Sequence, residues 1–293
     1  MKHAILGAGG VGGLIGTALA SLGEDVTVIV RPEKLAGYPS SLTLERPSGA
    51  ISGPARAVSQ LEEDDDVLWI ATKAFQLQAA LESVQSTPQM VVPLLNGVDH
   101  ISVLRARFGH DAVVPATIAV EAEHPEPGHF IQRSPFVGLN IAAAGGRLLG
   151  AVVSRLRQLG LTCAFIQNEK TLLWSKLCFL APFALVTSAS GKNKGEIYED
   201  PGWKAKLDAA VAEACAVAEK DGAEIDTAKL KKTFDSFPPT LRSSVQKDVA
   251  AGRQLELDAI AGPIARGGEH YGIPVPTTVE LMEMIEAKVH KRG

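Results

Sequence analysis

The pattern of apolar and polar positions divides the chain into two halves with different periodicities. Up to about residue 167, short apolar runs bounded by turn residues alternate with helix-like stretches. That alternation is typical of an open, mainly parallel sheet whose strands are connected by helices. Beyond residue 167 the periodicity is almost wholly helical. We therefore predict an α/β domain over residues 1–167 and an all-helical domain over residues 168–293.

The first strand of the predicted sheet is followed by a glycine cluster. An apolar run at 4–6 precedes the cluster, a helix-like stretch follows it, and a second apolar run occupies 26–30. Gly7, Gly9 and Gly12 fit the spacing G-x-G-x-x-G. Because this motif lies between a strand and a helix, as it does in dinucleotide-binding folds, it predicts a Rossmann-type domain.

Each glycine of the cluster has a physical reason. Gly7 suits the tight turn, Gly9 leaves room for a pyrophosphate to approach the backbone, and Gly12 allows the helix to pack closely on the strand. The phosphates would then lie at the start of the helix, which favours negative charge. We predict cofactor contacts at Gly7, Gly9, Gly10 and Gly12. The alternative is a glycine-rich helix start that packs tightly and binds nothing.

The residue at the end of the second strand selects between cofactors. An acidic side chain there would accept hydrogen bonds from the ribose of NAD, whereas a basic one would meet the 2′-phosphate of NADP. Arg31 occupies this position and Lys34 follows it. A guanidinium offers a planar fork of donors to a phosphate, so NADP is favoured. Glu33 nearby keeps NAD open, and Arg31 could also be an ordinary surface residue.

Polar residues follow two later strands. Lys73 comes after the apolar run 67–70, and Asn96, followed by Gly97, comes after the run 90–95. In an open α/β sheet, ligands lie beyond the carboxyl ends of the strands, so both side chains are expected at the cofactor. The alternatives are a surface lysine at a helix start and a plain Asn-Gly turn.

The rest of this half carries little predicted chemistry. We expect a hairpin over 41–57, a solvated acidic loop at 62–66, and a sheet extension with a hairpin over 112–144. His129 lies in that extension, and a lone strand histidine is more often structural than catalytic.

Composition excludes several classes of function. The net charge of −4 gives no reason to expect a nucleic-acid partner, and no histidine or cysteine spacing suggests a metal site. The three cysteines form no CxxC pair, which favours a reducing cytoplasm over a disulfide framework. Glycines between Gly7 and Gly16 argue against interpreting the apolar start as a signal peptide. The run 177–186 is too short to span a membrane.

One lysine stands out in the helical half. Lys176 is the only charged residue between Lys170 and Lys192. A lysine in so apolar a segment either extends its charged end to the surface or has a functional role. With an ordinary pKa of ~10.4 it would carry a proton at neutral pH, and it could donate that proton to a carbonyl oxygen as a hydride reaches the carbon. Helical spacing places Leu180 and Ala184 on the same face.

Two further candidates lie near the end of the chain. Ser244 and Asp248 are one helical turn apart, and Glu256 opens the next helix with an apolar face. By pattern alone, Glu256 is more often a solvated helix residue than a ligand to a substrate.

These features together resemble the ketopantoate reductase (2-dehydropantoate 2-reductase) family over nearly the whole chain. The resemblance rests on the glycine turn, Arg31, Lys73, Asn96-Gly97, Trp174-x-Lys176, Ser244-x-x-x-Asp248 and Arg253-x-x-Glu256 followed by Gly-Ile-Pro-Val-Pro. It implies a Rossmann domain, a helical domain and NADPH as the hydride donor. It further implies that Lys176 is the general acid and that Glu256 supports Lys176 and holds the substrate hydroxyl. Ser244 would contact the substrate carboxylate, Asn96 would adjoin cofactor and substrate, and Lys73 would adjoin the nicotinamide.

The sequence departs from the family at the substrate. Family members usually carry asparagine four and eight residues after the lysine, where this chain has Leu180 and Ala184. An apolar side chain cannot supply those hydrogen bonds, so a less polar 2-oxo acid or ketone is an alternative to ketopantoate. A protein that binds NADP without catalysis is a second alternative. The apolar faces of the helical half are sufficient for a homodimer, and the alternative is that they form the core.

Overall fold

The computed structural model describes residues 1–290 and contains two compact units. The first comprises residues 1–95 and 100–167. The second comprises residues 96–99 together with the chain from Asn168 onward. The short segment 96–99 therefore belongs to the helical unit, although its neighbours on both sides in sequence belong to the α/β unit.

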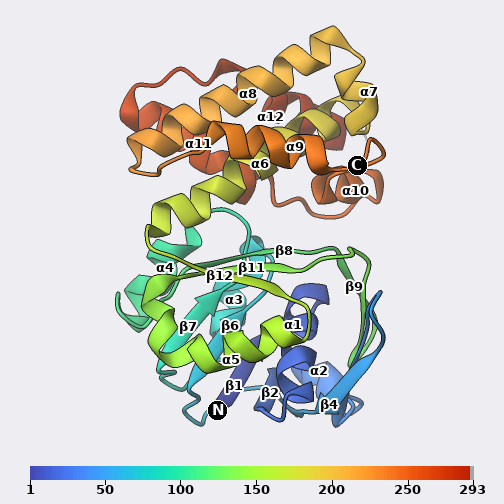
Figure 1. Ribbon diagram of the computed structural model, residues 1–293, viewed down its shortest axis with the longest axis vertical. Helices are drawn as coiled ribbons and strands as arrows, with labels where there is room; N and C mark the ends of the chain where they lie inside the picture. The colour runs from blue at the N-terminus through green and yellow to red at the C-terminus, as the bar shows by residue number, and fades with distance from the viewer. Residues whose placement is uncertain (291–293) are drawn as a thin grey trace. The chain divides into compact units, whose positions relative to one another are not determined.

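A five-stranded parallel sheet forms the centre of the first unit (Figure 1). Its strand order is β5-β2-β1-β6-β7. The strands are β1 Lys2–Leu6, β2 Asp25–Ile29, β5 Arg56–Val58, β6 Val67–Ile70 and β7 Met90–Pro93. The associated helices are α1 Gly10–Ser21, α2 Pro32–Leu35, η1 Ala74–Gln76, α3 Leu77–Leu81 and α4 His100–Phe108. All residues of β6 and β7 are buried, as expected for parallel strands covered on both faces. The predicted Rossmann-type arrangement is confirmed.

Two smaller sheets complete this unit. One has the order β4-β3-β10-β9 and the other the order β12-β11-β8. Their elements are β3 Ser41–Glu45, β4 Ile51–Pro54, β8 Ala116–Ala119, β9 Ala122–Glu126, β10 His129–Gln132, β11 Gly138–Ala142, η2 Ala143–Gly145, α5 Gly146–Gln158 and β12 Thr162–Ile166. The predicted hairpin over 41–57 is the antiparallel pair β3–β4.

The hairpin expected within 112–144 is present as β9–β10, but it does not belong to the same sheet as β8 and β11. Instead, β10 pairs in parallel with β3 and so joins the β3–β4 hairpin. The acidic run 62–66 also differs from expectation, because Asp65 is buried. Burial raises the pKa of the Asp65 carboxyl.

Helix α1 is enclosed between sheets. It contacts β1 and β2 on one side and β3, β4, β9 and β10 on the other. A Cβ atom at Gly13 would lie 2.0 Å from the ring of Phe130, so the glycine leaves the space in which the sheet that contains β10 packs on α1. This enclosure explains why residues 12–20 are all buried and why α1 lacks a polar face.

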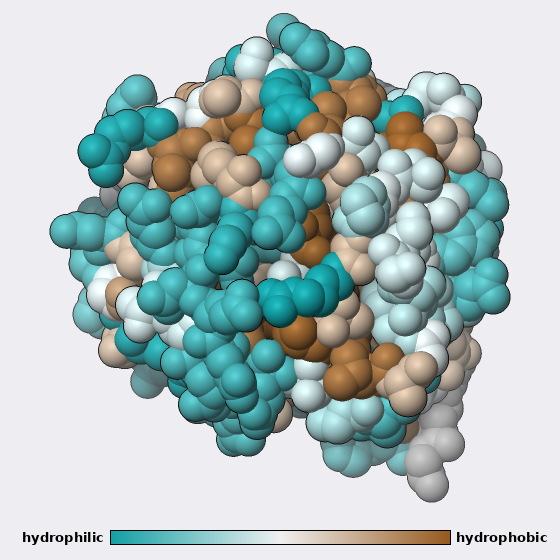
Figure 2. Space-filling model, turned by 90° about the horizontal axis from the view of Figure 1, so that it is seen from below, coloured by the Kyte–Doolittle hydropathy of each residue, from teal (hydrophilic) through white to brown (hydrophobic). Residues whose placement is uncertain are grey.

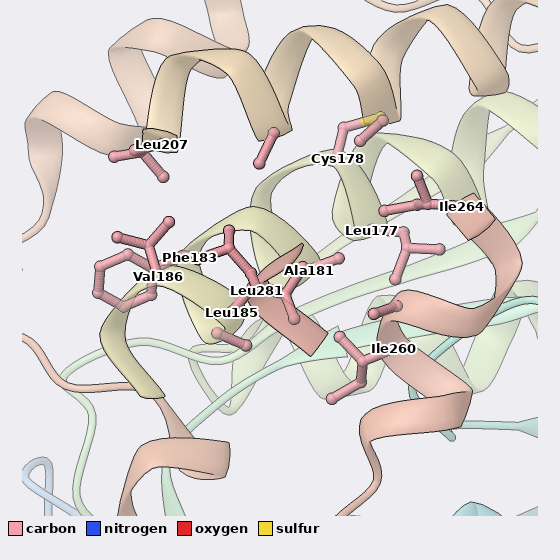
Figure 3. Close-up of a cluster of buried hydrophobic side chains, with 14 of the residues drawn as sticks. Leu177, Cys178, Ala181, Phe183, Leu185, Val186, Leu207, Ile260, Ile264 and Leu281 are labelled. Atoms are coloured by element: carbon pink, nitrogen blue, oxygen red, sulfur yellow. The ribbon is translucent and has the colours of Figure 1, made fainter. Parts of the chain in front are cut away.

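The second unit is helical, with α6 at its centre. Its helices are α6 Glu169–Ser190, α7 Lys194–Tyr198, α8 Pro201–Lys220, α9 Thr227–Ser236, α10 Ser244–Ala250, α11 Leu257–Tyr271 and α12 Pro276–His290. Helix α6 contacts α8, α9, α10, α11 and α12. Figure 3 shows side chains of α6, among them Leu177 and Ala181, packed with Ile260 and Ile264 of α11.

Among residues 1–290, α6 is the one helix that is long and apolar enough to cross a membrane. However, 78% of the most apolar 18-residue stretch of α6 is buried inside the protein, as expected for a core helix. Large apolar side chains that remain exposed lie at scattered positions, among them Phe75, Val103 and Phe136. Figure 2 agrees on the face that it shows, where hydrophilic residues predominate and hydrophobic ones form separate patches.

Candidate functional site

The glycine turn after β1 is tightly built except at one position. Gly7 has a φ of +93°, and a Cβ there would lie 2.8 Å from the Ala71 carbonyl carbon. A Cβ at Gly12 would lie 2.3 Å from the Gly7 oxygen, so both glycines have the packing roles that the sequence predicts. A Cβ at Gly10 would lie 2.4 Å from the Ala122 oxygen. Gly9, in contrast, has open space on its Cβ side, with no atom within 4 Å.

That open space adjoins the start of α1. Gly9 is the N-cap residue, no side chain caps the helix, and no acidic residue lies in its first turn. The backbone N–H groups at the start of a helix attract anions. The turn therefore fits a pyrophosphate, which could approach the backbone at Gly9.

Arg31 and Lys34 lie at the carboxyl end of β2. Arg31 is the N-cap residue of α2, and both side chains are exposed. Both are exposed basic side chains, and a guanidinium such as that of Arg31 matches the geometry of a phosphate. Lys73 is the N-cap residue of η1, just after β6, and is partly exposed.

Lys176 of α6 contacts Asn96 directly. Its Nζ donates a hydrogen bond of 2.9 Å to the Asn96 Oδ1, although the residues are 80 positions apart. Burial lowers the pKa of the Lys176 ammonium to about 8, while the negative charge of Glu256 acts in the opposite direction and raises it. A lysine with this pKa is still mostly protonated at pH 7 and can release its proton more readily than an exposed one.

Glu256 is buried at the start of α11, where it is the N-cap residue. The segment 96–99 packs against the same helix. Gly97 has a φ of +86°, and a Cβ there would lie 2.1 Å from the Ala259 oxygen. Asp99 forms an ion pair with Arg266 farther along α11. These contacts explain how Asn96 comes within hydrogen-bonding distance of Lys176. The Asn96-Gly97 dipeptide therefore packs on α11 and does not serve only as a turn.

Helix α6 is anchored two residues before its lysine. The Trp174 Nε1 donates to the Asp221 carboxylate at 2.8 Å, and the Tyr271 hydroxyl donates to the same carboxylate at 2.8 Å. Asp221 thereby connects α6 with the end of α11. The tryptophan in Trp174-x-Lys176 therefore has a structural partner in Asp221.

Ser244 lies in an exposed position as the first residue of α10. Its neighbour Ser243 is buried and caps the helix by accepting from the Gln246 N–H at 3.1 Å. Ser243 also bonds to the Thr187 hydroxyl of α6 at 2.7 Å, which fixes this end of α10. Asp248 pairs with Arg253 at 2.7 Å. The buried serine thus serves the structure, and the exposed one is available to a ligand.

The two apolar residues on the lysine face differ in their surroundings. Leu180 is only partly buried, whereas Ala184 is 2% exposed and belongs to the hydrophobic core. The face that begins at Lys176 therefore passes into the core at Ala184. Of the two positions, Leu180 is the one that retains surface.

Sequence reasoning missed Thr72. Its hydroxyl oxygen is buried without a hydrogen-bond partner, and its methyl group is the atom that a Cβ at Gly7 would meet at 2.9 Å. The sequence did contain a hint of this position, because Thr72 stands next to Lys73 at the end of β6.

His129 has a structural role between Glu45 and Glu126. Residues 1–290 contain no group of three potential metal ligands.

Comparison with known proteins gives matches over nearly the whole chain. The model of the family described as ketopantoate reductase PanE/ApbA matches residues 3–144, and the model of its C-terminal part matches residues 168–289. A 2-dehydropantoate 2-reductase from Caulobacter vibrioides is 29% identical over 97% of this chain and 98% of its own.

Solved structures that resemble this chain include a member of the same family. A PanE/ApbA family ketopantoate reductase from Ralstonia eutropha is 26% identical and covers 100% of this chain and 99% of its own, with a TM-score of 0.87. A D-mandelate dehydrogenase with NADH and anilino(oxo)acetate is 22% identical over 99% of both chains, with a TM-score of 0.85, and it is similar in fold.

Proposed function

Because this chain belongs to the ketopantoate reductase family and is an oxidoreductase acting on a CH–OH group, we propose that it reduces a 2-oxo acid with NADPH. By family resemblance, the first substrate to test is 2-dehydropantoate, which would give pantoate. The observation that carries the proposal is the hydrogen bond of 2.9 Å between Lys176 and Asn96, together with the charge of the buried Glu256, which raises the pKa of Lys176.

The chemistry that we propose requires one proton from the protein. A nicotinamide dinucleotide, when bound, supplies the hydride to the carbonyl carbon. Lys176 donates a proton to the carbonyl oxygen, so that C=O becomes CH–OH and the ammonium becomes an amine. Asn96 orients the Lys176 side chain through the observed hydrogen bond. Glu256 favours the protonated lysine by its charge, which helps the amine to regain a proton from solvent.

For the cofactor, we propose that the glycine turn from Gly7 to Gly12, Lys73 and Asn96 hold the dinucleotide and that Arg31 selects NADP. The open space at Gly9 and the uncapped start of α1 support the first part, and the exposed guanidinium of Arg31 supports the second. The D-mandelate dehydrogenase of similar fold was solved with NADH, so NADH belongs in every binding assay.

For the substrate, we propose that the exposed Ser244 meets the carboxylate and that Glu256 meets the hydroxyl. A less polar 2-oxo acid or ketone is the second candidate, and Leu180 favours it. This side chain lies one turn after Lys176 and keeps exposed surface, but it offers no hydrogen bond.

The decisive experiment measures kcat/KM with NADPH for ketopantoate and for a panel of 2-oxo acids with larger apolar side chains. Lys176→Ala should lower kcat by ~10²–10⁴ and leave the Kd for NADPH near that of the unmodified protein, as expected for loss of a general acid. Unchanged kcat in that variant would contradict the role of Lys176. Tight NADPH binding with no turnover of any carbonyl compound would favour the alternative that this protein binds NADP but catalyses no reaction.

We also propose a cytoplasmic enzyme that forms a homodimer. A ketopantoate reductase from Staphylococcus aureus that is described as dimeric is 17% identical to this chain and similar in fold, with a TM-score of 0.80. Sedimentation at several protein concentrations would test the dimer.

A further inference from the structure

Helix α6 keeps a short strip of accessible surface in the turns around its lysine. Between Trp174 and Ala189, the residues that are not buried are Ser175, Lys176, Phe179 and Leu180. Residues three and four apart lie on the same side of a helix, so Phe179 and Leu180 adjoin the lysine in the next turn. The strip is therefore polar at the end that holds the proposed general acid and apolar one turn farther along.

Phe179 belongs to a cluster of four aromatic rings. It stacks on Phe183 and Phe237, with ring centroids 5.8 Å and 5.1 Å away and angles of 16° and 19° between the rings. Phe234 of α9 lies against it at 4.7 Å with an angle of 54°. Phe183 and Phe234 are buried, whereas Phe179 and Phe237 are only partly buried. We call this stacked pair that retains surface, Phe179 and Phe237, the aromatic rim.

The outer ring of the rim is held in place by a buried lysine. Phe237 is the C-cap residue of α9, and Lys194 at the start of α7 is 7% exposed. The Lys194 Nζ donates to the Phe237 oxygen at 2.6 Å and to the Asp235 oxygen at 3.3 Å. The Lys194 N–H donates to the Leu241 oxygen at 3.0 Å. The rim is thus fixed before a ligand arrives, which lowers the entropic cost of binding one.

The chain that follows Phe237 leads to the proposed carboxylate contact. It continues into α10, whose first residue is Ser244. The hydroxyls of Ser243 and Thr187 share a hydrogen bond of 2.7 Å, so the start of α10 is joined to α6. A 2-oxo acid presents a carbonyl, a carboxylate and a side chain. The helical unit offers Lys176 to the first, Ser244 to the second and the rim to the third.

The rim favours one kind of side chain. Phe179 and Leu180 offer no hydrogen bond, so a polar group placed against them would lose its bonds to water. An aromatic ring gains more there than a saturated group of the same size, because paired rings attract each other beyond the area that they bury. One helical turn spans about 5.4 Å, a length that the side chain of a small 2-oxo acid can cover from a carbonyl at Lys176.

We propose that the aromatic rim and Leu180 bind an aromatic ring of the substrate, so that this protein prefers 2-oxo acids with an aryl side chain to those with polar or saturated side chains. The inference rests on the proposed function, in which Lys176 protonates the carbonyl oxygen of a 2-oxo acid. The reaction itself is unchanged: the nicotinamide supplies the hydride, Lys176 supplies the proton, and C=O becomes CH–OH. The rim contributes to substrate binding and takes no part in proton transfer.

The first test compares two substrates with the same carbon skeleton. Phenylpyruvate and cyclohexylpyruvate differ only in whether the ring is aromatic. With NADPH, kcat/KM for phenylpyruvate should exceed that for cyclohexylpyruvate by about two- to tenfold, the range for one aromatic pair, and should also exceed that for ketopantoate. Phe179→Leu and Phe237→Leu should each bring the phenyl-to-cyclohexyl ratio to about one, mainly through KM. Phe237 lies at the end of a helix, so Phe237→Leu gives the same readout if Phe179→Leu does not fold.

Phe183→Leu is the matched control. Phe183 stacks on the same ring of Phe179 but is buried, so it cannot touch a ligand at the rim. Its replacement should lower the temperature of thermal unfolding through lost packing and should keep the phenyl-to-cyclohexyl ratio. An equal loss of that ratio in Phe183→Leu and Phe179→Leu would assign the effect to packing within the cluster and would overturn the rim as a binding surface.

Unreactive acids separate this inference from the function on which it rests. Phenylpropanoate and cyclohexylpropanoate lack the 2-oxo group, so calorimetry on the NADPH-saturated protein gives their Kd values without turnover. If 2-oxo acids are reduced with no preference for the aromatic ring, or ketopantoate is reduced better than phenylpyruvate, the rim is overturned and the proposed function stands. If no 2-oxo acid is reduced, the proposed function fails and the two Kd values decide. Tighter binding of phenylpropanoate that Phe237→Leu abolishes would support the rim, and equal Kd values would overturn it.

Discussion

Gly97 lies so close to Ala259 that no other residue fits: an added Cβ would lie 2.1 Å from the Ala259 oxygen. This contact holds the segment 96–99 against α11, whose first residue follows Glu256. It therefore sets the position from which Asn96 accepts the Lys176 hydrogen bond. The hydrogen bond between Asn96 and Lys176 therefore depends on the backbone contact between Gly97 and Ala259 as well as on the two side chains.

Gly97→Ala should separate Asn96 from Lys176. We expect kcat to fall by about 10- to 100-fold, because small misplacements of catalytic groups are costly. Gly109→Ala is the matched control, since Gly109 has a similar φ of +90° but no atom within 4 Å of its Cβ position. Steady-state kinetics and thermal unfolding of both variants would test this. Equal losses of kcat would show that backbone strain, and not the contact with Ala259, is responsible.

The pH profile of the reduction should report Lys176. Its pKa is about 8, so kcat/KM should fall as pH rises through about 8, when the ammonium loses the proton that it donates. Glu256 raises this pKa, and Glu256→Gln should therefore move the falling limb to lower pH. Rates from pH 6 to 10 for both proteins would measure the shift. An unchanged midpoint would exclude electrostatic support of Lys176 by Glu256.

Arg31→Ala should change cofactor preference. Losing a charge-assisted contact with the 2′-phosphate should weaken NADPH by about 10- to 100-fold and NADH by much less. Arg147→Ala, an exposed arginine of α5 in the same unit, is the control. Binding titrations with both dinucleotides would measure the two constants. Equal weakening of NADH and NADPH by Arg31→Ala would mean that Arg31 is only structural.

Leu180→Asn should alter substrate preference. The amide restores a hydrogen-bonding group that family resemblance leads one to expect there, so kcat/KM for ketopantoate should rise about tenfold relative to apolar 2-oxo acids, the effect of about one hydrogen bond. Leu180→Met keeps the site apolar and is the control. Position 184 is unsuitable, because an amide in place of the buried Ala184 would enter the core. The same ratio in both variants would remove Leu180 from the determinants of specificity.

His3 should make the protein sensitive to acid. It is fully buried, its Nδ1 accepts from the Trp69 Nε1 at 3.2 Å, and burial lowers its pKa to about 4. Below the ordinary value of 6.5 the unfolded chain binds a proton that the folded chain does not, so stability falls as pH decreases from 6.5 towards 4. The loss is about 3 kcal/mol at its full extent.

Denaturant unfolding at several pH values measures this slope. His3→Asn should flatten it between pH 6.5 and 5, whatever the effect on absolute stability. The control is His110→Asn, at an exposed histidine of the same unit, and it should leave the slope unchanged. A slope that persists in His3→Asn would assign the acid sensitivity to other groups.

Local patterns predicted most of the fold. The glycine spacing and the apolar runs around it predicted the strand, turn, helix and strand that the structure contains, because these features depend on neighbours in sequence. The partner of β10 could not be predicted this way, since pairing with β3 joins residues such as Phe130 and Leu44 from distant parts of the chain. The buried Asp65 was missed for a similar reason, as nothing in an acidic run marks which carboxylate the fold will enclose.

The candidate site was likewise predicted only in part from local sequence. Lys176 stood out as a charge in an apolar helix, and the end of a strand pointed to Asn96. Their contact, and its dependence on Gly97 and Ala259, required the tertiary structure.

The membership of residues 96–99 in the helical unit bears on how this protein can be divided. A fragment that starts at Asn168 would retain every helix from α6 onward but would lack the segment that packs on α11 at Ala259. A fragment that ends at Gln167 would carry the same segment without the surface that it covers. The two halves are thus interleaved along the chain, and exchanging either half between relatives would require a second junction around residues 96–99.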